Sequence, residues 1–387
     1  MLGYHLKQST LKTAAWLGSA MVGKSSPPAR LENFHRILVF QAGGIGDILR
    51  IFPLLESMHT ACPESELFTL SPFHTTVFDL LPHPNIIRQS LGYNPTSDHH
   101  TFKAKLQLVR ALRDWHFDLI VNPARGQGML QNSLLSYAFG APFRVGFDDA
   151  GAGFANNIRV RLLPNRPIVQ QNLNLLRALG IEPNVEHIHL RVPQAEQEYA
   201  ETTIARVVQG PKSLIAIHPG STWQSRLQWR LPRYVEVISS LLQQHSYTIL
   251  LLGTPPETSL GEAIMQQLDS ARVVNLIGKT SLLQVAALLS RCTLFIGNDS
   301  GLLHIALGLG TPSIGLFGYT DPQQVICPEG PCKALHHPED ADLYLHQPFF
   351  TFDSAKPNPI DNIQVNDVLE AAKSLLLGGS LSSGPRS

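Results

Sequence analysis

The residue with the clearest chemical potential is Asp47, which ends the glycine-rich run at 41–47 (QAGGIGD). This run follows a short apolar stretch and precedes a helical pattern, which predicts a strand-to-helix turn whose backbone can approach a ligand closely. A carboxylate there could accept a proton from a ligand hydroxyl, or it could only cap its helix. Gly43, Gly44 and Gly46 do not fit the G-x-G-x-x-G spacing of a dinucleotide-binding turn.

A second loop, at 218–222 (HPGST), follows another apolar run. Small hydroxyl-bearing residues at the carboxyl end of a strand suit phosphate contact through backbone N–H groups. Ser221 and Thr222 are therefore candidate ligand-binding residues, and Arg226 or Arg230 could supply positive charge.

Two more loops follow apolar runs in the second half of the chain. Glu257 opens a helix after 253–256 (GTPP), where it could accept hydrogen bonds from two adjacent ribose hydroxyls or be an ordinary first-turn acid. The run 297–304 (GNDSGLLH) ends a strand and opens a helix, so the amides around Ser300 and Gly301 suit a diphosphate. His304 could reach back to that diphosphate or pack in the core. Three of the four loops thus predict a nucleotide held by the second half.

These loops depend on alternating strands and helices. Alternation of this kind predicts parallel sheets covered on both faces, in two α/β domains with a ligand cleft between them. The middle, 164–212, is rich in Pro and polar residues around one helical piece at 171–179 and is interpreted as the end of the first domain and a linker. The predicted strands are 36–40, 66–70, 117–121, 143–147, 214–217, 247–252, 272–276, 293–297 and 312–317, and the predicted helices are 48–58, 103–114, 232–244, 257–268, 281–290, 301–308 and 363–377.

The composition excludes several classes of protein. A chain of 387 residues suits two domains of ordinary size. Lys plus Arg number 30 and Asp plus Glu number 30, so there is no global field to attract a nucleic acid. Four scattered cysteines do not make a disulfide scaffold and favour a reducing, cytoplasmic location. The turn at 327–332 (CPEGPC) lacks a second ligand pair at zinc spacing, so no metal site is predicted.

The N-terminal segment is distinctive. Its apolar stretch at 13–23 is well short of the roughly 20 residues that span a bilayer. Residues 1–31 contain Lys7, Lys12, Lys24 and Arg30 and no carboxylate. We interpret 1–35 as a basic leader or an interfacial amphipathic helix that contacts an anionic membrane surface.

With these motifs in place, the chain resembles glycosyltransferase family 9, the ADP-heptose:lipopolysaccharide heptosyltransferases. The resemblance extends from about residue 36 to 322 and rests on ILVFQAGGIGD (37–47), IHPGS (217–221), LLGTPPE (251–257) and the segment 275–322, of which 296–322 is the most specific. It implies a GT-B fold of two Rossmann-like domains facing each other across a cleft. The acceptor side would be 36–195 and the nucleotide-sugar side 196–355, and 356–387 would cross back to the first domain.

The resemblance also implies a reaction. An inverting enzyme, without metal or cofactor, would move a heptose-type sugar from ADP-heptose to the lipopolysaccharide core or a related lipid-linked or surface glycan at the inner face of the cytoplasmic membrane. Asp47 would be the base, in a loop whose glycines Gly43, Gly44 and Gly46 lie near the acceptor. The implied donor-binding residues are Ser221, Thr222, Arg226, Glu257 at the ribose, and Asp299, Ser300, Gly301 and His304 along the diphosphate and sugar.

Two positions depart from the family pattern, because Gln41 and Leu227 stand where its members commonly carry basic residues. Two alternatives therefore stay open: a different nucleotide sugar as donor, or a nucleotide-sugar-binding homologue without turnover. An NAD-dependent oxidoreductase is disfavoured, since neither half contains G-x-G-x-x-G with an acid about 20 residues further on.

Overall fold

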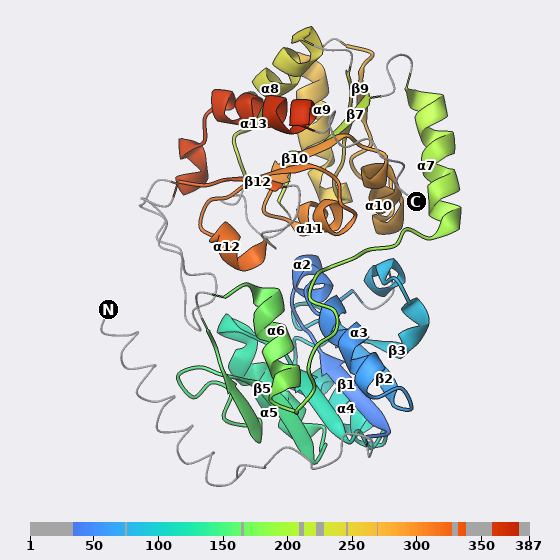
Figure 1. Ribbon diagram of the computed structural model, residues 1–387, viewed down its shortest axis with the longest axis vertical. Helices are drawn as coiled ribbons and strands as arrows, with labels where there is room; N and C mark the ends of the chain where they lie inside the picture. The colour runs from blue at the N-terminus through green and yellow to red at the C-terminus, as the bar shows by residue number, and fades with distance from the viewer. Residues whose placement is uncertain are drawn as a thin grey trace. The chain divides into compact units, whose positions relative to one another are not determined.

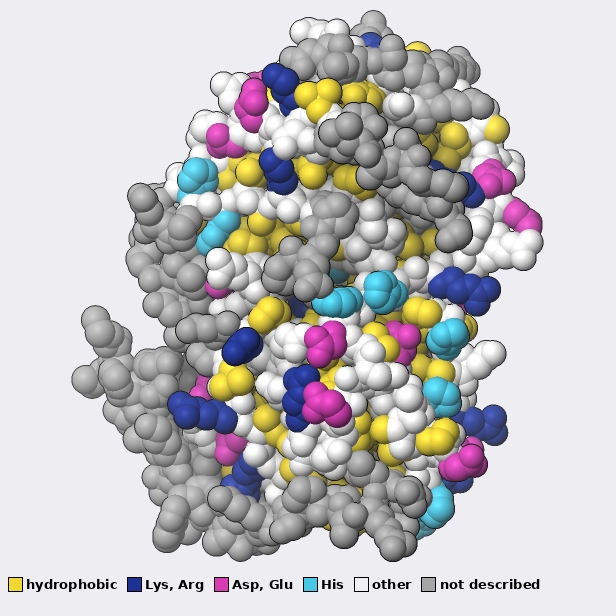
Figure 2. Space-filling view, in the orientation of Figure 1, with side chains coloured by type: hydrophobic (Ala, Val, Ile, Leu, Met, Phe, Trp, Pro, Cys, Tyr) yellow, Lys and Arg dark blue, Asp and Glu magenta, His cyan; other side chains and the backbone are white. Residues whose placement is uncertain are grey.

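The computed structural model describes residues 34–73, 76–163, 166–208, 213–221, 228–244, 247–268, 270–326, 332–337 and 358–378 (Figure 1). Contacts divide them into two compact units that meet in sequence between Ile188 and His189. The predicted leader therefore lies outside the described residues, apart from its last two positions. The space-filling view shows basic and acidic side chains interspersed over one face (Figure 2), in keeping with the equal numbers of the two charges.

The first unit contains one parallel sheet with the strand order β3-β2-β1-β4-β5-β6. Its strands are β1 (Arg36–Phe40), β2 (Glu66–Ser71), β3 (Ile87–Gly92), β4 (Leu119–Asn122), β5 (Phe143–Asp148) and β6 (Ile158–Arg161), and its helices are α2 (Ile45–Leu49), α3 (Phe52–Ala61), α4 (Phe102–Arg113), α5 (Met129–Ala138) and α6 (Ile168–Arg177). The order of the strands reverses between β1 and β4, so the loops that follow these two strands share the switch point where ligands bind in such sheets.

Both faces of this sheet are covered. Residues 37–40 of β1 are fully buried although successive side chains point to opposite faces. Leu38 and Phe40 pack in one cluster with Leu112 of α4 and Leu135 of α5. Helices α3 and α6 contact each other. The layering explains why the central strands of this sheet are continuous apolar runs.

The second unit repeats the architecture with the strand order β12-β11-β10-β7-β8-β9. Its strands are β7 (Ser213–His218), β8 (Tyr247–Leu251), β9 (Val273–Asn275), β10 (Leu294–Asn298), β11 (Ser313–Leu316) and β12 (Cys332–Leu335). Its helices are α7 (Gln194–Val207), α8 (Leu231–Gln244), α9 (Thr258–Gln267), α10 (Leu282–Ser290), α11 (Gly301–Gly308), α12 (Pro322–Val325) and α13 (Val365–Gly378). Here the switch point lies between β7 and β10, and the loops 219–221 and 299–300 follow those strands.

The C-terminal helix α13 packs within the second unit. It contacts α8 and the strands β10, β11 and β12, and its side chains Val368, Ala371 and Ala372 are buried in the unit's main hydrophobic cluster. The predicted domain boundaries, and the return of 356–387 to the first domain, stay predictions.

The predicted central strands are confirmed, and the differences concentrate at the edges and in the helices. Strands β3, β6 and β12 were not predicted; each is an edge strand with polar, partly exposed residues. The helical pattern at 48–58 forms two helices, because Pro53 in the first turn of α3 has no N–H to continue α2. Helix α5 was not predicted. Helix α7 falls within the segment 164–212 that was interpreted as the end of the first domain and a linker, and it buries only Ala200 and Thr203.

We predict that Gly153→Ala lowers the free energy of unfolding by about 1–3 kcal/mol. A Cβ at Gly153 would overlap the backbone carbonyl oxygen of Phe147, which cannot move without bending β5. Urea denaturation measures the change. Gly128→Ala is the matched control, because its Cβ would have only the Asn132 amide, at 4.0 Å, within reach. Equal stability of the two variants would contradict the explanation.

Candidate active site

Asp47 lies at the switch point of the first unit. Its Oδ2 accepts a hydrogen bond from the Gly44 N–H at 3.2 Å, which caps α2. Its Oδ1 lies 3.2 Å from Arg50 Nη1 and 3.5 Å from Arg125 Nη2. The Asp47 side chain is 37% exposed, whereas the two arginines are buried. The two sequence-based alternatives are thus compatible: the carboxylate caps its helix with one oxygen and also faces solvent beside two cations.

The glycine-rich loop is shaped around this carboxylate. A Cβ at Gly43 would overlap Oδ2 of Asp47, so the side chain keeps this orientation only beside a glycine. The Oε1 atom of Gln41 accepts the Gly43 N–H at 3.0 Å, and the Gln41 side chain is buried. Gln41 therefore braces the backbone of the loop from within, a role that fits an uncharged amide.

Arg125 was not predicted from the sequence. It follows β4, the strand beside β1, and donates through Nη1 to Asn172 Oδ1 at 2.7 Å, while Asn172 Nδ2 donates to the Arg50 carbonyl at 2.9 Å. Burial lowers the pKa of Arg125 to about 10, although Asp47 acts in the opposite direction, so the guanidinium stays charged at neutral pH. Two cations thus hold one carboxylate. The one signal that could have identified Arg125 is that it follows β4, the strand next to β1, so that its loop lies beside the loop of Asp47.

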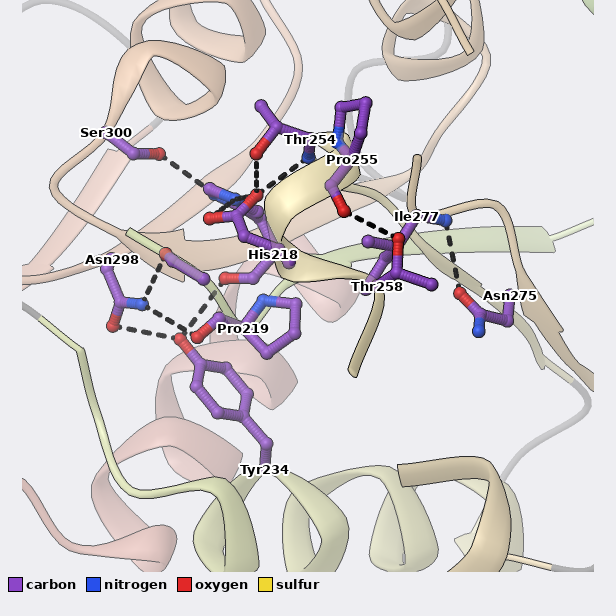
Figure 3. A network of polar contacts seen from close by, with 12 residues as sticks. His218, Pro219, Tyr234, Thr254, Pro255, Thr258, Asn275, Ile277, Asn298 and Ser300 are labelled. Carbon is purple, nitrogen blue, oxygen red and sulfur yellow. Dashed lines mark hydrogen bonds and ion pairs between the residues drawn. The ribbon is translucent and has the colours of Figure 1, made fainter. Parts of the chain in front are cut away.

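In the second unit, a buried histidine connects two of the predicted loops (Figure 3). His218 Nε2 lies 3.3 Å from both carboxylate oxygens of Glu257, and Nδ1 lies 3.1 Å from Ser300 Oγ. A carboxylate only accepts, so Nε2 must carry a proton. In the neutral ring Nδ1 then accepts from the Ser300 hydroxyl, whereas in the imidazolium it donates and leaves the hydroxyl proton for another acceptor. The sequence prediction included His218 in the second loop and assigned it no role.

Glu257 is more constrained than an ordinary first-turn acid. Its Oε2 accepts the N–H and the hydroxyl of Thr254, both at 2.7 Å. Burial raises the pKa of this carboxyl, but the hydrogen bond and charge of His218 and the contacts of Thr254 outweigh it and hold the pKa at about 2. A Cβ at Gly220 would overlap Oε1. The predicted ribose contact stays a prediction.

Asn298, at the end of β10, joins this site to the loop after β7. Its Oδ1 accepts the Trp229 N–H and the Tyr234 hydroxyl, both at 3.0 Å, and its Nδ2 donates to the carbonyls of Pro219 and Gly220 at 3.2 and 2.9 Å. The amide is fully buried and uses both its ends (Figure 3). Asn298 therefore holds the backbone of residues 219–220 in position. The sequence prediction included its motif and missed this residue.

The start of α11 has an unusual cap. Ser300 is the N-cap residue, yet its side chain makes no capping hydrogen bond, because its hydroxyl faces His218 instead. The amides of the first turn, Gly301 among them, have no intrahelical acceptor and are left to meet another one. His304 is buried, and its Nε2 lies 3.4 Å from Asp299 Oδ1. The structure therefore brings together His218, Glu257 and Ser300, and pairs Asp299 with His304.

Other candidates have different outcomes. Thr222 and Arg226 lie outside the described residues, whereas Ser221 is the last described residue of the loop after β7. Arg230 forms two hydrogen bonds with Asp361, at 2.9 and 2.8 Å, which occupies its guanidinium elsewhere. Trp229, the residue before Arg230, is buried in the core. Among the described residues, no group of three His, Cys, Asp or Glu side chains could hold a metal ion, and no helix has the length and hydrophobicity to cross a membrane.

Comparison with solved structures defines the class of fold. A glycosyltransferase family 9 crystal structure from Veillonella parvula aligns with a TM-score of 0.73 at 19% identity, over 90% of this chain and 99% of that chain. Escherichia coli ADP-heptose lps heptosyltransferase II aligns with a TM-score of 0.68 at 19% identity, over 89% and 99%. The predicted class, α/β of the GT-B type with two Rossmann-like parallel sheets, is confirmed.

Sequence comparison gives the family. The model of "Glycosyltransferase family 9 (heptosyltransferase)" matches residues 105–333, and the chain belongs to this family. A lipopolysaccharide core heptosyltransferase of Haemophilus influenzae is 22% identical over 76% of this chain and 82% of its own length. Lipopolysaccharide heptosyltransferase 2 of Escherichia coli K12 is 24% identical over 74% and 84%.

We predict that Glu257→Gln removes a pH-dependent part of the stability. The folded pKa of about 2 lies below the ordinary 4.5, so the ionised carboxylate stabilises the fold above pH 4.5, and this contribution disappears as the pH falls toward 2. The wild type should exceed the variant by up to about 3 kcal/mol near pH 7, and the gap should fall to less than half of that value near pH 3. Urea denaturation at both pH values measures it.

Glu201→Gln provides the control for this experiment. Glu201 forms an exposed ion pair with Arg291, which contributes less than about 1 kcal/mol in solvent and should show a much smaller pH effect. A gap between wild type and Glu257→Gln that is the same at both pH values would show that the charge of Glu257 is not what stabilises the loop.

Proposed function

We propose that the chain is an inverting glycosyltransferase that moves a heptose-type sugar from ADP-heptose to the lipopolysaccharide core or a related lipid-linked glycan. Membership of the heptosyltransferase family supports the reaction, and the names of the relatives support donor and acceptor. The observation that carries the proposal is the start of α11, where the Ser300 side chain turns away from its own helix and leaves the first amides for an anion.

On this proposal the second unit binds the leaving group. The amide dipoles at Ser300 and Gly301 meet the diphosphate, whose negative charge grows as the bond to the anomeric carbon breaks. An imidazolium at His218 would let the Ser300 hydroxyl donate to the same oxygens, while Glu257 balances the charge of the ring. The predicted contributions of Ser221, Thr222, Arg226, Asp299 and His304 belong to this donor site. The transfer is proposed to need no metal, because these groups supply the electrostatic stabilisation.

The first unit would supply the base. A carboxylate oxygen of Asp47 takes the proton of the acceptor hydroxyl, whose oxygen attacks the anomeric carbon from the face opposite ADP. The bond between that carbon and the β-phosphate oxygen breaks, and ADP leaves with the electron pair. Arg50 and Arg125 pair with Asp47 and orient its carboxylate before the acceptor arrives. The enzyme would work in the cytoplasm, at the membrane that holds its lipid-linked acceptor.

We predict that Asp47→Asn lowers kcat by about 10²–10⁴-fold and leaves ADP affinity unchanged. The amide oxygen can still accept the Gly44 N–H, so the loop should keep its shape while the base is lost. Transfer is measured with ADP-, UDP-, GDP- and CMP-sugars, and ADP binding by calorimetry. Transfer that survives in Asp47→Asn would remove Asp47 as the base. A wild type that binds ADP but transfers no sugar would be a nucleotide-sugar-binding homologue without turnover. A wild type that binds NAD more tightly than ADP would exclude the glycosyltransferase class.

His218 offers a sharper test of the donor site. Asparagine places an amide near the position of the ring Nδ1 and glutamine near Nε2, so His218→Asn can retain the Ser300 contact and His218→Gln the Glu257 contact. We predict that both weaken ADP binding by about tenfold or more, because each variant keeps only one of the two contacts by which the ring connects Glu257 and Ser300. Calorimetry with ADP measures it. Wild-type affinity in both variants would restrict His218 to a structural role.

A further inference from the structure

Exposed apolar side chains are concentrated on two helices of the first unit. Of the six large hydrophobic side chains exposed in the described part of the chain, four lie on α4 and α5: Phe102 (82% exposed), Leu106 (38%), Leu134 (44%) and Tyr137 (48%). Scattered exposed apolar residues are ordinary, whereas a contiguous group marks a contact surface. The clustering therefore requires an explanation beyond chance.

The two helices are neighbours. Lys105 Nζ of α4 donates to Gln131 Oε1 of α5 at 3.4 Å, and both helices pack through Leu112 and Leu135 on the same hydrophobic cluster. Leu134 lies one turn beyond Gln131, so the exposed surface of α4 continues onto α5. We name the outward residues of these two helices the α4–α5 face.

The α4–α5 face is basic as well as apolar. Helix α4 (FKAKLQLVRALR) contains four cations and no carboxylate; the nearest acid in the chain is Asp114, directly after its end. Within the described residues Lys103, Arg110 and Arg113 have no carboxylate partner. Phe102, Leu106 and Arg110 are spaced by four residues, so they follow one another along one side of the helix. Unpaired cations thus flank exposed apolar side chains.

We propose that the α4–α5 face docks on an anionic lipid bilayer. Phe102 and Leu106 would enter the boundary between head groups and acyl chains, and Lys103, Arg110 and Arg113 would meet lipid phosphates. A bilayer matches both properties of the face, since it offers an apolar interior beneath a layer of negative charge. The inference rests on the proposed function in one respect, namely that a lipid-linked acceptor gives the enzyme a reason to meet the membrane.

This surface differs from the N-terminal leader predicted to contact a membrane. The leader lies outside the described residues, whereas α4 and α5 are part of the folded first unit. If the leader alone bound lipid, changes on α4 would have no effect on binding. That difference makes the two origins separable by substitution in the full-length chain.

The test is sedimentation of the full chain with vesicles of phosphatidylglycerol and phosphatidylethanolamine, and with vesicles of phosphatidylcholine alone. The docking variant combines Phe102→Ser with Arg110→Glu. Replacing a cation by an anion changes the charge by two, and each charge alters vesicle affinity about fivefold, so the variant should bind anionic vesicles at least about thirtyfold more weakly. The wild type should sediment with anionic vesicles and should show almost no binding to vesicles of phosphatidylcholine alone.

The matched control combines Leu377→Ser with Arg206→Glu, two exposed side chains of the second unit, and should bind like wild type. Equal binding of the docking variant and wild type, as binding through the leader would give, overturns the proposal. So does a wild type that binds no anionic vesicle, which would favour an acidic protein partner instead. Transfer to a lipid-free acceptor fragment is measured in parallel: its absence in wild type counts against the proposed function and leaves the docking result intact.

Discussion

The second unit is organised around the buried carboxylate of Glu257. Removing a charge from water is costly unless hydrogen bonds replace the lost hydration, and here Thr254 and His218 replace it. The same carboxylate fixes which ring nitrogen of His218 carries a proton, and the ring in turn draws the Ser300 hydroxyl away from its own helix. The missing side-chain cap at the start of α11 is therefore a consequence of an acid located two strands away.

Near the switch point of each unit, a carboxylate caps the start of a helical turn in the same way. Asp47 and Glu257 are both the third residue of a helical turn, and both accept the backbone N–H of the residue that caps it. Both occupy space that the Cβ of a nearby residue would otherwise fill, at Gly43 and Gly220. The partners differ, with arginines beside the first carboxylate and a histidine beside the second. One geometry thus presents a solvent-facing acid in one unit and a buried one in the other.

Much of this arrangement could be predicted from the sequence. Central strands are buried on both faces, so they stand out as apolar runs, and the loops that follow them contain the site residues. Edge strands such as β6 (IRVR) meet a neighbour on one side only and tolerate polar residues, which removes the signal. Arg125 and Asn298 were missed for another reason. Their importance comes from contacts with loops far away in the sequence, and no local spacing encodes those contacts.

If Asp47 is the base, as proposed, the two arginines beside it affect what happens after the acceptor is deprotonated. Two cations meet one carboxylate, so a proton on Asp47 leaves their repulsion uncompensated in a largely buried setting. A protonated Asp47 is therefore disfavoured beside the two arginines, and water can reach the partly exposed carboxyl to accept the proton. On the proposed mechanism, the proton taken from the acceptor would pass from Asp47 to water, and the loop would return to its resting charge before the next acceptor binds.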